Sequence, residues 1–133
     1  AIILRLYLMM RLLVNIKNAS RAKKETVQMP FSNFDFAVAR FLLAAGFVAA
    51  VDKKNMGKKS YLEMKLRYRD GVSAFTDFRL ISKPSRRFYI GYRDLQSVKQ
   101  GYGLAAISTP EGVLSNNEAR KKKVGGEYLF QVW

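Results

Sequence analysis

Cations, hydroxyls and a tyrosine stand together in the segment Ser82–Tyr89, which reads Ser-Lys-Pro-Ser-Arg-Arg-Phe-Tyr. Pro84 restricts the backbone, so the neighbouring cations are presented at a small cost in conformational entropy. Arginine side chains bind phosphate through two hydrogen bonds, and an exposed tyrosine can stack on an unpaired base. A basic turn with Tyr89 in the core is an equally good interpretation. The candidate RNA-binding residues of this segment are Lys83, Pro84, Ser85, Arg86, Arg87 and Tyr89.

A second candidate is the pair of hydroxyls Ser108 and Thr109, which Pro110 and Gly112 follow. Small hydroxyls at a strand end can donate to and accept from base edges and 2′-hydroxyls of RNA. Taken alone, the segment is better explained as a turn, in which proline and glycine have their usual places.

The third candidate is Gly125-Gly126-Glu127. Two glycines allow another backbone to approach closely. The Glu127 carboxylate can accept a hydrogen bond from the amino group of a base, or it can pair with a nearby arginine. The motif is weak by itself, as is Arg120–Lys123, whose charges suit a helix C-terminus.

The charge of the chain connects these segments to nucleic acid. Its 133 residues include 24 Lys and Arg against 10 Asp and Glu, a formal net charge of +14. Such a field repels itself unless a polyanion neutralises it, and RNA or DNA would do so with release of counterions. The alternative is a basic protein that uses its charge for solubility.

Histidine and cysteine are both missing from the sequence. Disulfides, Cys/His zinc sites, histidine acid–base catalysis and Ser-His-Asp triads are therefore excluded. A dyad of Ser108 with a lysine, or Glu127 acting as a base, has no supporting motif. We expect no enzyme activity, no cofactor and no metal.

The apolar N-terminus is predicted to be a core-packed helix. Arg5 and Arg11 interrupt it, and its longest apolar run is far shorter than the roughly twenty residues of a membrane span. Leu6, Met9 and Leu13 instead share one helical stripe. We expect no membrane association, and an amphipathic organelle presequence is the lesser alternative.

The remaining pattern predicts an α+β fold of two small packed domains with mostly antiparallel sheets, residues 1–81 and 82–133. The first domain is expected to contain helices to about Asn18 and over 33–45, the latter capped by Ser32 and ended by Gly46. Its predicted strands are 25–29, 47–51, 61–68 and 74–81, with a charged loop over 52–59. In the second domain we expect strands 87–90, 104–109 and 127–133, a helical turn over 93–98, and a helix after Ser115.

The order and spacing of several short segments resemble the bacterial-type family of small-subunit ribosomal protein eight. Each segment is weak alone, but the collinear set is specific and covers about residues 11 to 133. The matching segments are 16–19, 27–30 with Ser32, 42–48, 81–84 with Arg87 and Tyr89, 101–104, 107–109 with 112–113, 118–119, and 124–127.

This resemblance implies a structural protein of the small ribosomal subunit, with the C-terminal domain as the main RNA-recognition half. Its partners would be a helical junction in the central domain of small-subunit rRNA, neighbouring small-subunit proteins and, in bacteria, its own mRNA. It would act in the cytoplasmic ribosome, or in an organellar one as the lesser alternative. By similarity, Tyr89, Ser108, Thr109 and Glu127 meet the core RNA site. Flanking basic contacts fall on Lys17, Asn18, Ser32, Lys83, Arg86 and Arg87.

Some residues depart from the family pattern. Arg11 stands where an acidic residue is usual, and Asn33 and Asp35 replace lysines after Ser32. Ser85 replaces a glycine and Pro110 replaces a serine, which puts the base contacts of the recognition loop in doubt. A free nucleic-acid-binding regulator, such as an mRNA-binding translational repressor, needs the same basic surface and is the main rival interpretation.

Overall fold

The computed structural model describes the chain from Ile2 to Trp133, with side chains from Leu4 onward, as an α+β protein. Its backbone divides into two compact units. One, the N-terminal unit, is Tyr7–Thr76. The other, the C-terminal unit, is Asp77–Trp133 together with the residues up to Leu6. This division falls between Thr76 and Asp77, five residues before the boundary expected between residues 81 and 82.

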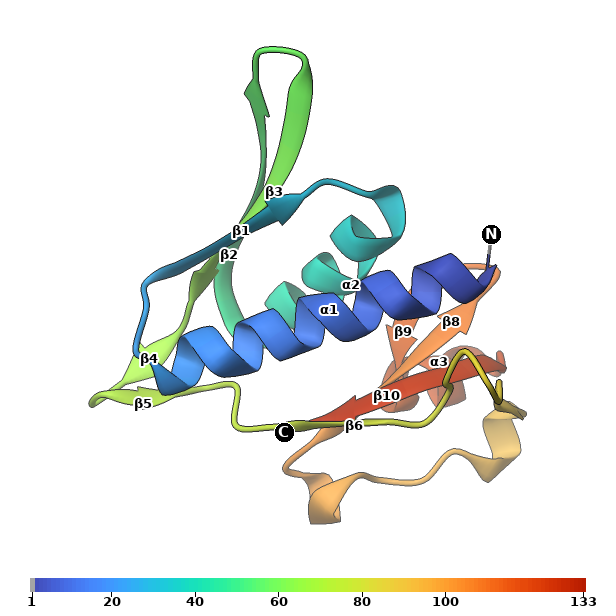
Figure 1. Cartoon of the computed structure of the whole chain (residues 1–133). Coiled ribbons are helices and arrows are strands. Elements are labelled where there is room, and N and C mark those ends of the chain that lie inside the picture. The colour runs from blue at the N-terminus through green and yellow to red at the C-terminus, as the bar shows by residue number, and fades with distance from the viewer. Residues whose placement is uncertain (1) are drawn as a thin grey trace. The chain divides into compact units, whose positions relative to one another are not determined.

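The N-terminal unit combines helices with a three-stranded antiparallel sheet in the order β1-β3-β2 (Figure 1). Helix α1 (Ile2–Arg21) leads into β1 (Thr26–Pro30) and α2 (Asn33–Ala44). Strands β2 (Val48–Met56) and β3 (Lys59–Leu66) form a long hairpin, and β4 (Tyr68–Arg69) with β5 (Val72–Ser73) forms a short one. One sheet face is buried, because alternate residues such as Val27, Met29, Leu62 and Met64 are inaccessible.

The ends of α2 agree with the sequence prediction. The Ser32 hydroxyl accepts a hydrogen bond from the Asp35 backbone N–H at 3.1 Å, which satisfies one orphan donor of the first turn. After Ala45, Gly46 adopts a left-handed φ of +84°, and Phe47 N–H bonds back to the Leu42 carbonyl. A glycine is suited to this position because it has no Cβ to clash.

The predicted charged loop over residues 52–59 is wrong. The β2–β3 ladder continues through Asn55↔Ser60 to Met56↔Lys59, which leaves only Gly57 and Lys58 in the turn. Gly57 has φ +65°, which suits the first central position of a tight hairpin turn. Lysine-rich strands at the end of a hairpin need no buried face, so the alternation used to find strands is missing there.

The C-terminal unit is built on a sheet in the order β6-β10-β8-β9, with β7 also paired to β10. Its elements are β6 (Phe78–Leu80), β7 (Tyr89–Ile90), 3₁₀ turns at Tyr92–Asp94 and Lys99–Gly101, β8 (Leu104–Thr109), β9 (Gly112–Ser115), α3 (Asn116–Lys122) and β10 (Gly126–Val132). All of its strand pairings are antiparallel. As predicted, Ser115 caps α3, accepting from the Glu118 N–H at 3.1 Å.

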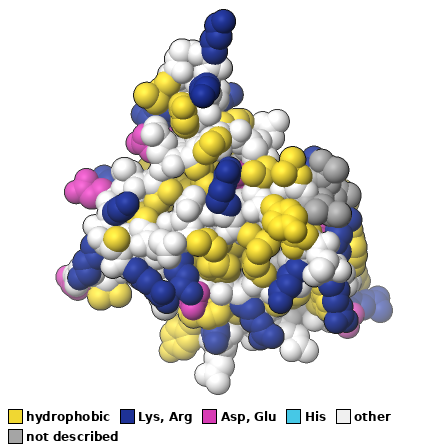
Figure 2. Space-filling model, viewed as in Figure 1, with side chains coloured by type: hydrophobic (Ala, Val, Ile, Leu, Met, Phe, Trp, Pro, Cys, Tyr) yellow, Lys and Arg dark blue, Asp and Glu magenta, His cyan; other side chains and the backbone are white. Residues whose placement is uncertain are grey.

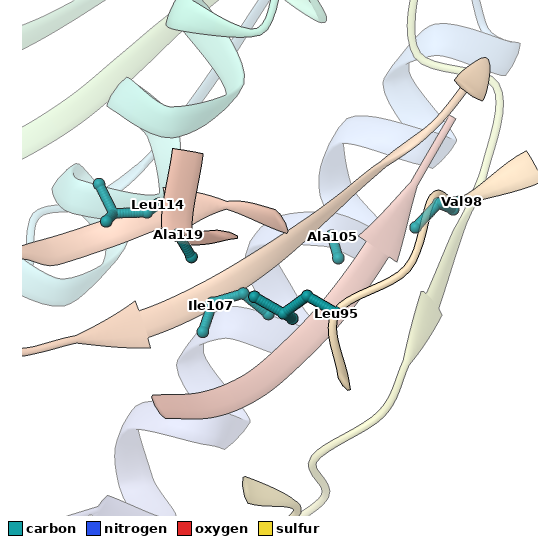
Figure 3. Packing of buried hydrophobic residues seen from close by; sticks show 6 residues of the cluster. All are labelled: Leu95, Val98, Ala105, Ile107, Leu114 and Ala119. Carbon is teal, nitrogen blue, oxygen red and sulfur yellow. The ribbon is translucent and has the colours of Figure 1, made fainter. Parts of the chain in front are cut away.

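A small apolar cluster connects α3 to the sheet and to the preceding loop (Figure 3). Buried Asn116 adds polar links, because its amide accepts from the Ala105 N–H and donates to the Gln96 carbonyl. These bonds fix the loop before β8 and thereby the strand that carries Ser108. The cluster consists of Leu95, Val98, Ala105, Ile107, Leu114 and Ala119.

Several predicted boundaries in this half need correction. The strand expected over 74–81 is reduced to β6, because Ala74 and Phe75 are bonded into the β4–β5 hairpin through the Arg67 carbonyl and the Ser73 hydroxyl. Strand β9 was not expected, since a four-residue strand gives almost no periodic signal. In the part of the chain that is described, no helix is long and apolar enough to cross a membrane.

Candidate nucleic-acid interface

Three predicted site residues form a row across the C-terminal sheet. Tyr89 of β7 lies directly opposite Glu127 of β10, and Glu127 lies directly opposite Ser108 of β8. Directly opposed residues of antiparallel strands project to the same face. The sheet register therefore brings together side chains that are up to 38 residues apart in the sequence. We call Tyr89, Glu127 and Ser108, together with Arg87, the C-terminal row.

Arg87 joins the row through its two neighbours. Its Nε and Nη2 donate to the two Glu127 carboxylate oxygens at 3.1 and 3.0 Å, a bidentate pair. Its guanidinium carbon also lies 5.1 Å from the centroid of the Tyr89 ring. The hydrogen bond to Glu127 raises the pKa of Arg87, so this cation keeps its charge at any physiological pH. A pairing of Glu127 with a nearby arginine was one of its two predicted roles.

The exposure of the row is graded. Glu127 is 8% exposed, whereas Tyr89 is 60% exposed and Ser108 is half-buried. The Ser108 hydroxyl has no hydrogen-bond partner in the described chain, so it can both donate and accept. Because the Tyr89 side chain is largely exposed, its alternative placement in the core is wrong. The row offers an open aromatic ring and an unoccupied hydroxyl on either side of a fixed, partly buried ion pair.

The basic segment before the row is a closed loop. Lys83 and Arg86 exchange two backbone hydrogen bonds of 2.9 and 3.0 Å around Pro84 and Ser85. At the ends of the loop, the buried Ser82 hydroxyl accepts from the Phe88 N–H and donates to the Phe88 carbonyl. Lys83 and Arg86 are thus exposed on a backbone that is already ordered.

Arg79 was missed as a candidate and lines a shallow hollow with two residues of this loop, Lys83 and Arg86. It lies on β6, opposite Gln131 of β10, and it is exposed. A single arginine in an alternating strand looks like an ordinary solvent-facing residue. It lies only four residues before Lys83, so its place beside the predicted cations could have been inferred from the sequence.

The Thr109 hydroxyl makes its hydrogen bonds within the protein. Its hydroxyl donates to the Gly112 carbonyl at 2.9 Å and accepts from the Glu111 N–H at 3.1 Å, which closes the turn between β8 and β9. Pro110 fits this turn, where no backbone donor is needed from it. The turn interpretation thus describes Thr109, while Ser108 has the available hydroxyl.

The two glycines before Glu127 allow strands to approach one another. A Cβ on Gly126 would lie 2.0 Å from the Ser108 carbonyl oxygen, and one on Gly125 would lie 2.4 Å from the Ile90 carbonyl oxygen. Both contacts are with backbone, which cannot move aside cheaply. The close approach predicted for these glycines is made by β7 and β8, and it sets the spacing of the row.

The predicted flanking residues of the N-terminal unit lie on separate elements. Lys17 and Asn18 are in the last turns of α1, where Asn18 lines a shallow hollow with Lys24, Thr26 and Gln28. Ser32 instead caps α2, so one lone pair of its hydroxyl is already used.

Near Ser32, Asp35 is fully buried, and its carboxylate oxygens make no hydrogen bond within the described chain. Burial raises the pKa of Asp35, against smaller lowering effects of the Ser32 hydroxyl and the positive charge of Arg11. The Arg11 and Asp35 departures from the family pattern are thus electrostatically coupled. Because Asp35 is inaccessible, it makes no surface that RNA could contact. In the described part of the chain, no three acidic side chains are grouped so as to hold a metal ion.

Comparison with known proteins identifies relatives of this chain. The family model for Ribosomal protein S8 matches residues 9–133. The small ribosomal subunit protein uS8 of Mycoplasmopsis agalactiae is 42% identical over 122 residues, which cover 92% of this chain and 93% of that protein. The uS8 proteins of Clostridioides difficile and Thermus aquaticus are 38% and 37% identical, over 92% of this chain and 93% and 94% of theirs.

Proposed function

The chain belongs to the ribosomal protein S8 family of the small ribosomal subunit, and on this premise we propose that it binds a helical junction in the central domain of the small-subunit rRNA. Its role there is structural, and it supports assembly of the subunit. Neighbouring small-subunit proteins are its other partners. The matched relatives are ribosomal proteins rather than enzymes, and we propose no catalytic role for this chain.

The observation that carries this proposal is the C-terminal row. A junction differs from a regular duplex in exposing unpaired bases, which can stack on aromatic side chains and present their edges. The open Tyr89 ring can take such a base, while the Ser108 hydroxyl can bond to a base edge or a 2′-hydroxyl. Arg87 keeps N–H donors beyond the two that Glu127 accepts, and these can reach a phosphate.

Glu127 serves mainly to orient Arg87 in this proposal. An ionised carboxylate near phosphates is unfavourable unless it accepts hydrogen bonds, and Arg87 supplies two of them. The carboxylate oxygens retain lone pairs that can accept from the amino group of a base. Holding Arg87 in place before RNA arrives lowers the entropy lost on binding.

Cations outside the row would supply affinity rather than selectivity. Lys83 and Arg86 on the closed loop, and Lys17 in the N-terminal unit, suit contacts with phosphates, which carry no sequence information. Affinity should therefore fall steeply between low and physiological salt. The same surface can bind an mRNA that mimics the junction, which is how control of the chain's own synthesis would operate.

Co-sedimentation with small ribosomal subunits at moderate salt tests the proposal, with direct titration of a junction RNA beside it. We expect the chain to remain with the subunit and to prefer the junction to a duplex of arbitrary sequence. A chain that binds both RNAs equally and leaves the subunit at moderate salt would instead be a free nucleic-acid-binding regulator. A flat response to salt would contradict RNA binding through phosphates.

A further inference from the structure

The end of the β2–β3 hairpin is a two-stranded arm of the N-terminal unit (Figure 1). Strand β1 accompanies β3 only as far as the pair Pro30↔Tyr61. Beyond it, β2 and β3 continue through Asn55↔Ser60 and Met56↔Lys59, with one more bond from the Phe31 N–H to the Ser60 carbonyl. The Ser60 hydroxyl donates to the Asn55 side chain at 2.9 Å, so the ladder remains ordered to its tip. We call residues 53–60 the arm.

Positive charge is concentrated on this arm. It carries Lys53, Lys54, Lys58 and Lys59, all exposed, and no acidic residue. Lys53 lies over the Phe31 ring, with its ammonium 4.4 Å from the centroid. The other three lysines have no hydrogen bond or ion pair within the described chain. Lys and Arg side chains stand out on the projecting hairpin in Figure 2.

The acidic residues of the hairpin lie midway along it, directly before the arm. Asp52 and Glu63 are directly opposite each other across the ladder. Like charges in such positions repel, and they place a negative pair directly before the positively charged arm. A polyanion is therefore attracted to the arm rather than to the middle of the hairpin, because three unpaired ammonium groups are gathered on the arm.

The spacing of the lysines suits a chain of phosphates. Lys54 is opposite Tyr61, so Lys59 is its diagonal neighbour on the same face, with Cα atoms roughly 7–8 Å apart. Lys58 follows in the turn. Lysine ammonium groups on flexible stems act as point charges toward phosphate and do not read bases. These three lysines can thus neutralise neighbouring phosphates of one strand.

We propose that the arm binds the phosphate backbone of an RNA duplex, as a second contact separate from the C-terminal row. Single-stranded RNA is usually bound by stacking on exposed aromatic rings, and the aromatic side chains that adjoin the arm, Phe31 and Tyr61, are both half-buried. The deep major groove of an RNA helix is too narrow to be entered, so the arm lies along the backbone across the shallow minor groove. The contact rests on the proposed RNA binding of the chain but not on recognition of a junction.

The test compares two triple variants that each remove three positive charges. K54Q/K58Q/K59Q changes the arm, and K121Q/K122Q/K123Q changes the exposed lysines at the end of α3. Both are titrated over a range of salt with a duplex RNA of arbitrary sequence and with the junction RNA. The charge-preserving K54R/K58R/K59R is the third protein.

For the arm variant, we expect about tenfold weaker duplex binding at low salt, and a slope of log affinity against log salt reduced by roughly two. The α3 variant and the arginine variant should keep the wild-type slope. Preference for the junction over the duplex should survive in all three.

An unchanged slope in the arm variant would overturn the proposal, as would an equal reduction in the α3 variant. If the arm variant kept wild-type RNA binding but no longer bound an acidic protein partner, the arm would be a protein-binding site, and this would overturn the proposal too. If instead the wild type showed no preference for the junction, the proposed function would fail while the arm could still pass its own test.

Discussion

The C-terminal row and the lysine arm present polar groups in opposite ways. In the row, Arg87 and Glu127 are bonded to each other, and the sheet register fixes the positions of Tyr89 and Ser108. On the arm, Lys54, Lys58 and Lys59 have no partner within the described chain and lie on flexible stems. A preorganised cluster can distinguish one RNA surface from another, because a misplaced partner leaves buried groups unsatisfied. Unpaired cations, by contrast, attract any phosphate and do not distinguish one RNA from another.

The largest effect should come from breaking the spacing of the row. In G126A the new Cβ would stand 2.0 Å from the Ser108 carbonyl oxygen, so β8 and β10 must separate. We expect the C-terminal unit to lose roughly 3 kcal/mol in free energy of unfolding, with loss of junction binding. Urea unfolding measures the first quantity. G91A is the control, because nothing lies within 4 Å of its added Cβ; equal stability of the two variants would show that the strands are not so closely packed.

The next effect tests the ion pair. E127Q keeps the shape of the side chain but cannot hold Arg87 through two charged hydrogen bonds. We expect about tenfold weaker binding to the junction, without weaker binding to an arbitrary duplex, since one negative charge has been removed. E111Q makes the same charge change on an exposed turn residue of the same unit. If E127Q bound the junction as tightly as E111Q does, Glu127 would be a structural residue and would leave the site.

A smaller contrast separates the two adjacent hydroxyls. S108A should weaken junction binding by roughly threefold to tenfold, because it removes an unoccupied donor and acceptor, and it should leave stability unchanged. T109V should lower the free energy of unfolding by about 1 kcal/mol, because the Thr109 hydroxyl bridges the β8–β9 turn. Titration and urea unfolding of both variants give the comparison. If instead T109V weakened junction binding and S108A did not, Thr109 would be the recognition residue, as first predicted.

The smallest effect concerns the pH dependence of the N-terminal unit. Burial raises the pKa of Asp35 above its ordinary value of 3.8, so the folded chain binds this proton more tightly than the unfolded chain does. The resulting stability is fully present below 3.8 and is lost as the pH rises through the folded-state pKa. Relative to D35N, the wild type should therefore gain stability as the solution is acidified from neutral pH. If the difference in free energy of unfolding between the wild type and D35N did not change with pH, the Asp35 carboxylate would be solvated.

Local chemistry allowed much of the fold to be predicted. Ser32 and Ser115 were expected as helix caps, and both accept the backbone N–H three residues later. Strand β8 was predicted with its observed bounds, Leu104–Thr109, because its first four residues are apolar and follow a glycine-containing turn. The prediction failed for strands that have no periodic pattern of apolar residues. These are the lysine-rich end of the β2–β3 hairpin and the four-residue strand β9.

The candidate site was predictable as residue types but not as an arrangement. The sequence indicates that Tyr89, Ser108 and Glu127 suit RNA, yet their order across three strands depends on a register that no local pattern specifies. A pairing of Glu127 with an arginine was foreseen as an alternative, without the contact of Arg87 with Tyr89. Arg79 was missed for another reason: it is only four residues before Lys83, but a single arginine in a short strand resembles any solvent-facing residue.

The central claim is that the C-terminal row selects its RNA, whereas Lys17, the cations of the closed loop and the arm lysines supply affinity for any RNA. Its most direct test is the ratio of affinities for the junction and for an arbitrary duplex, measured by titration for the wild type, S108A and K17A at one salt concentration. We predict that S108A lowers this ratio and that K17A weakens binding to both RNAs while leaving the ratio unchanged. A ratio that stays constant in S108A and falls in K17A would contradict the account.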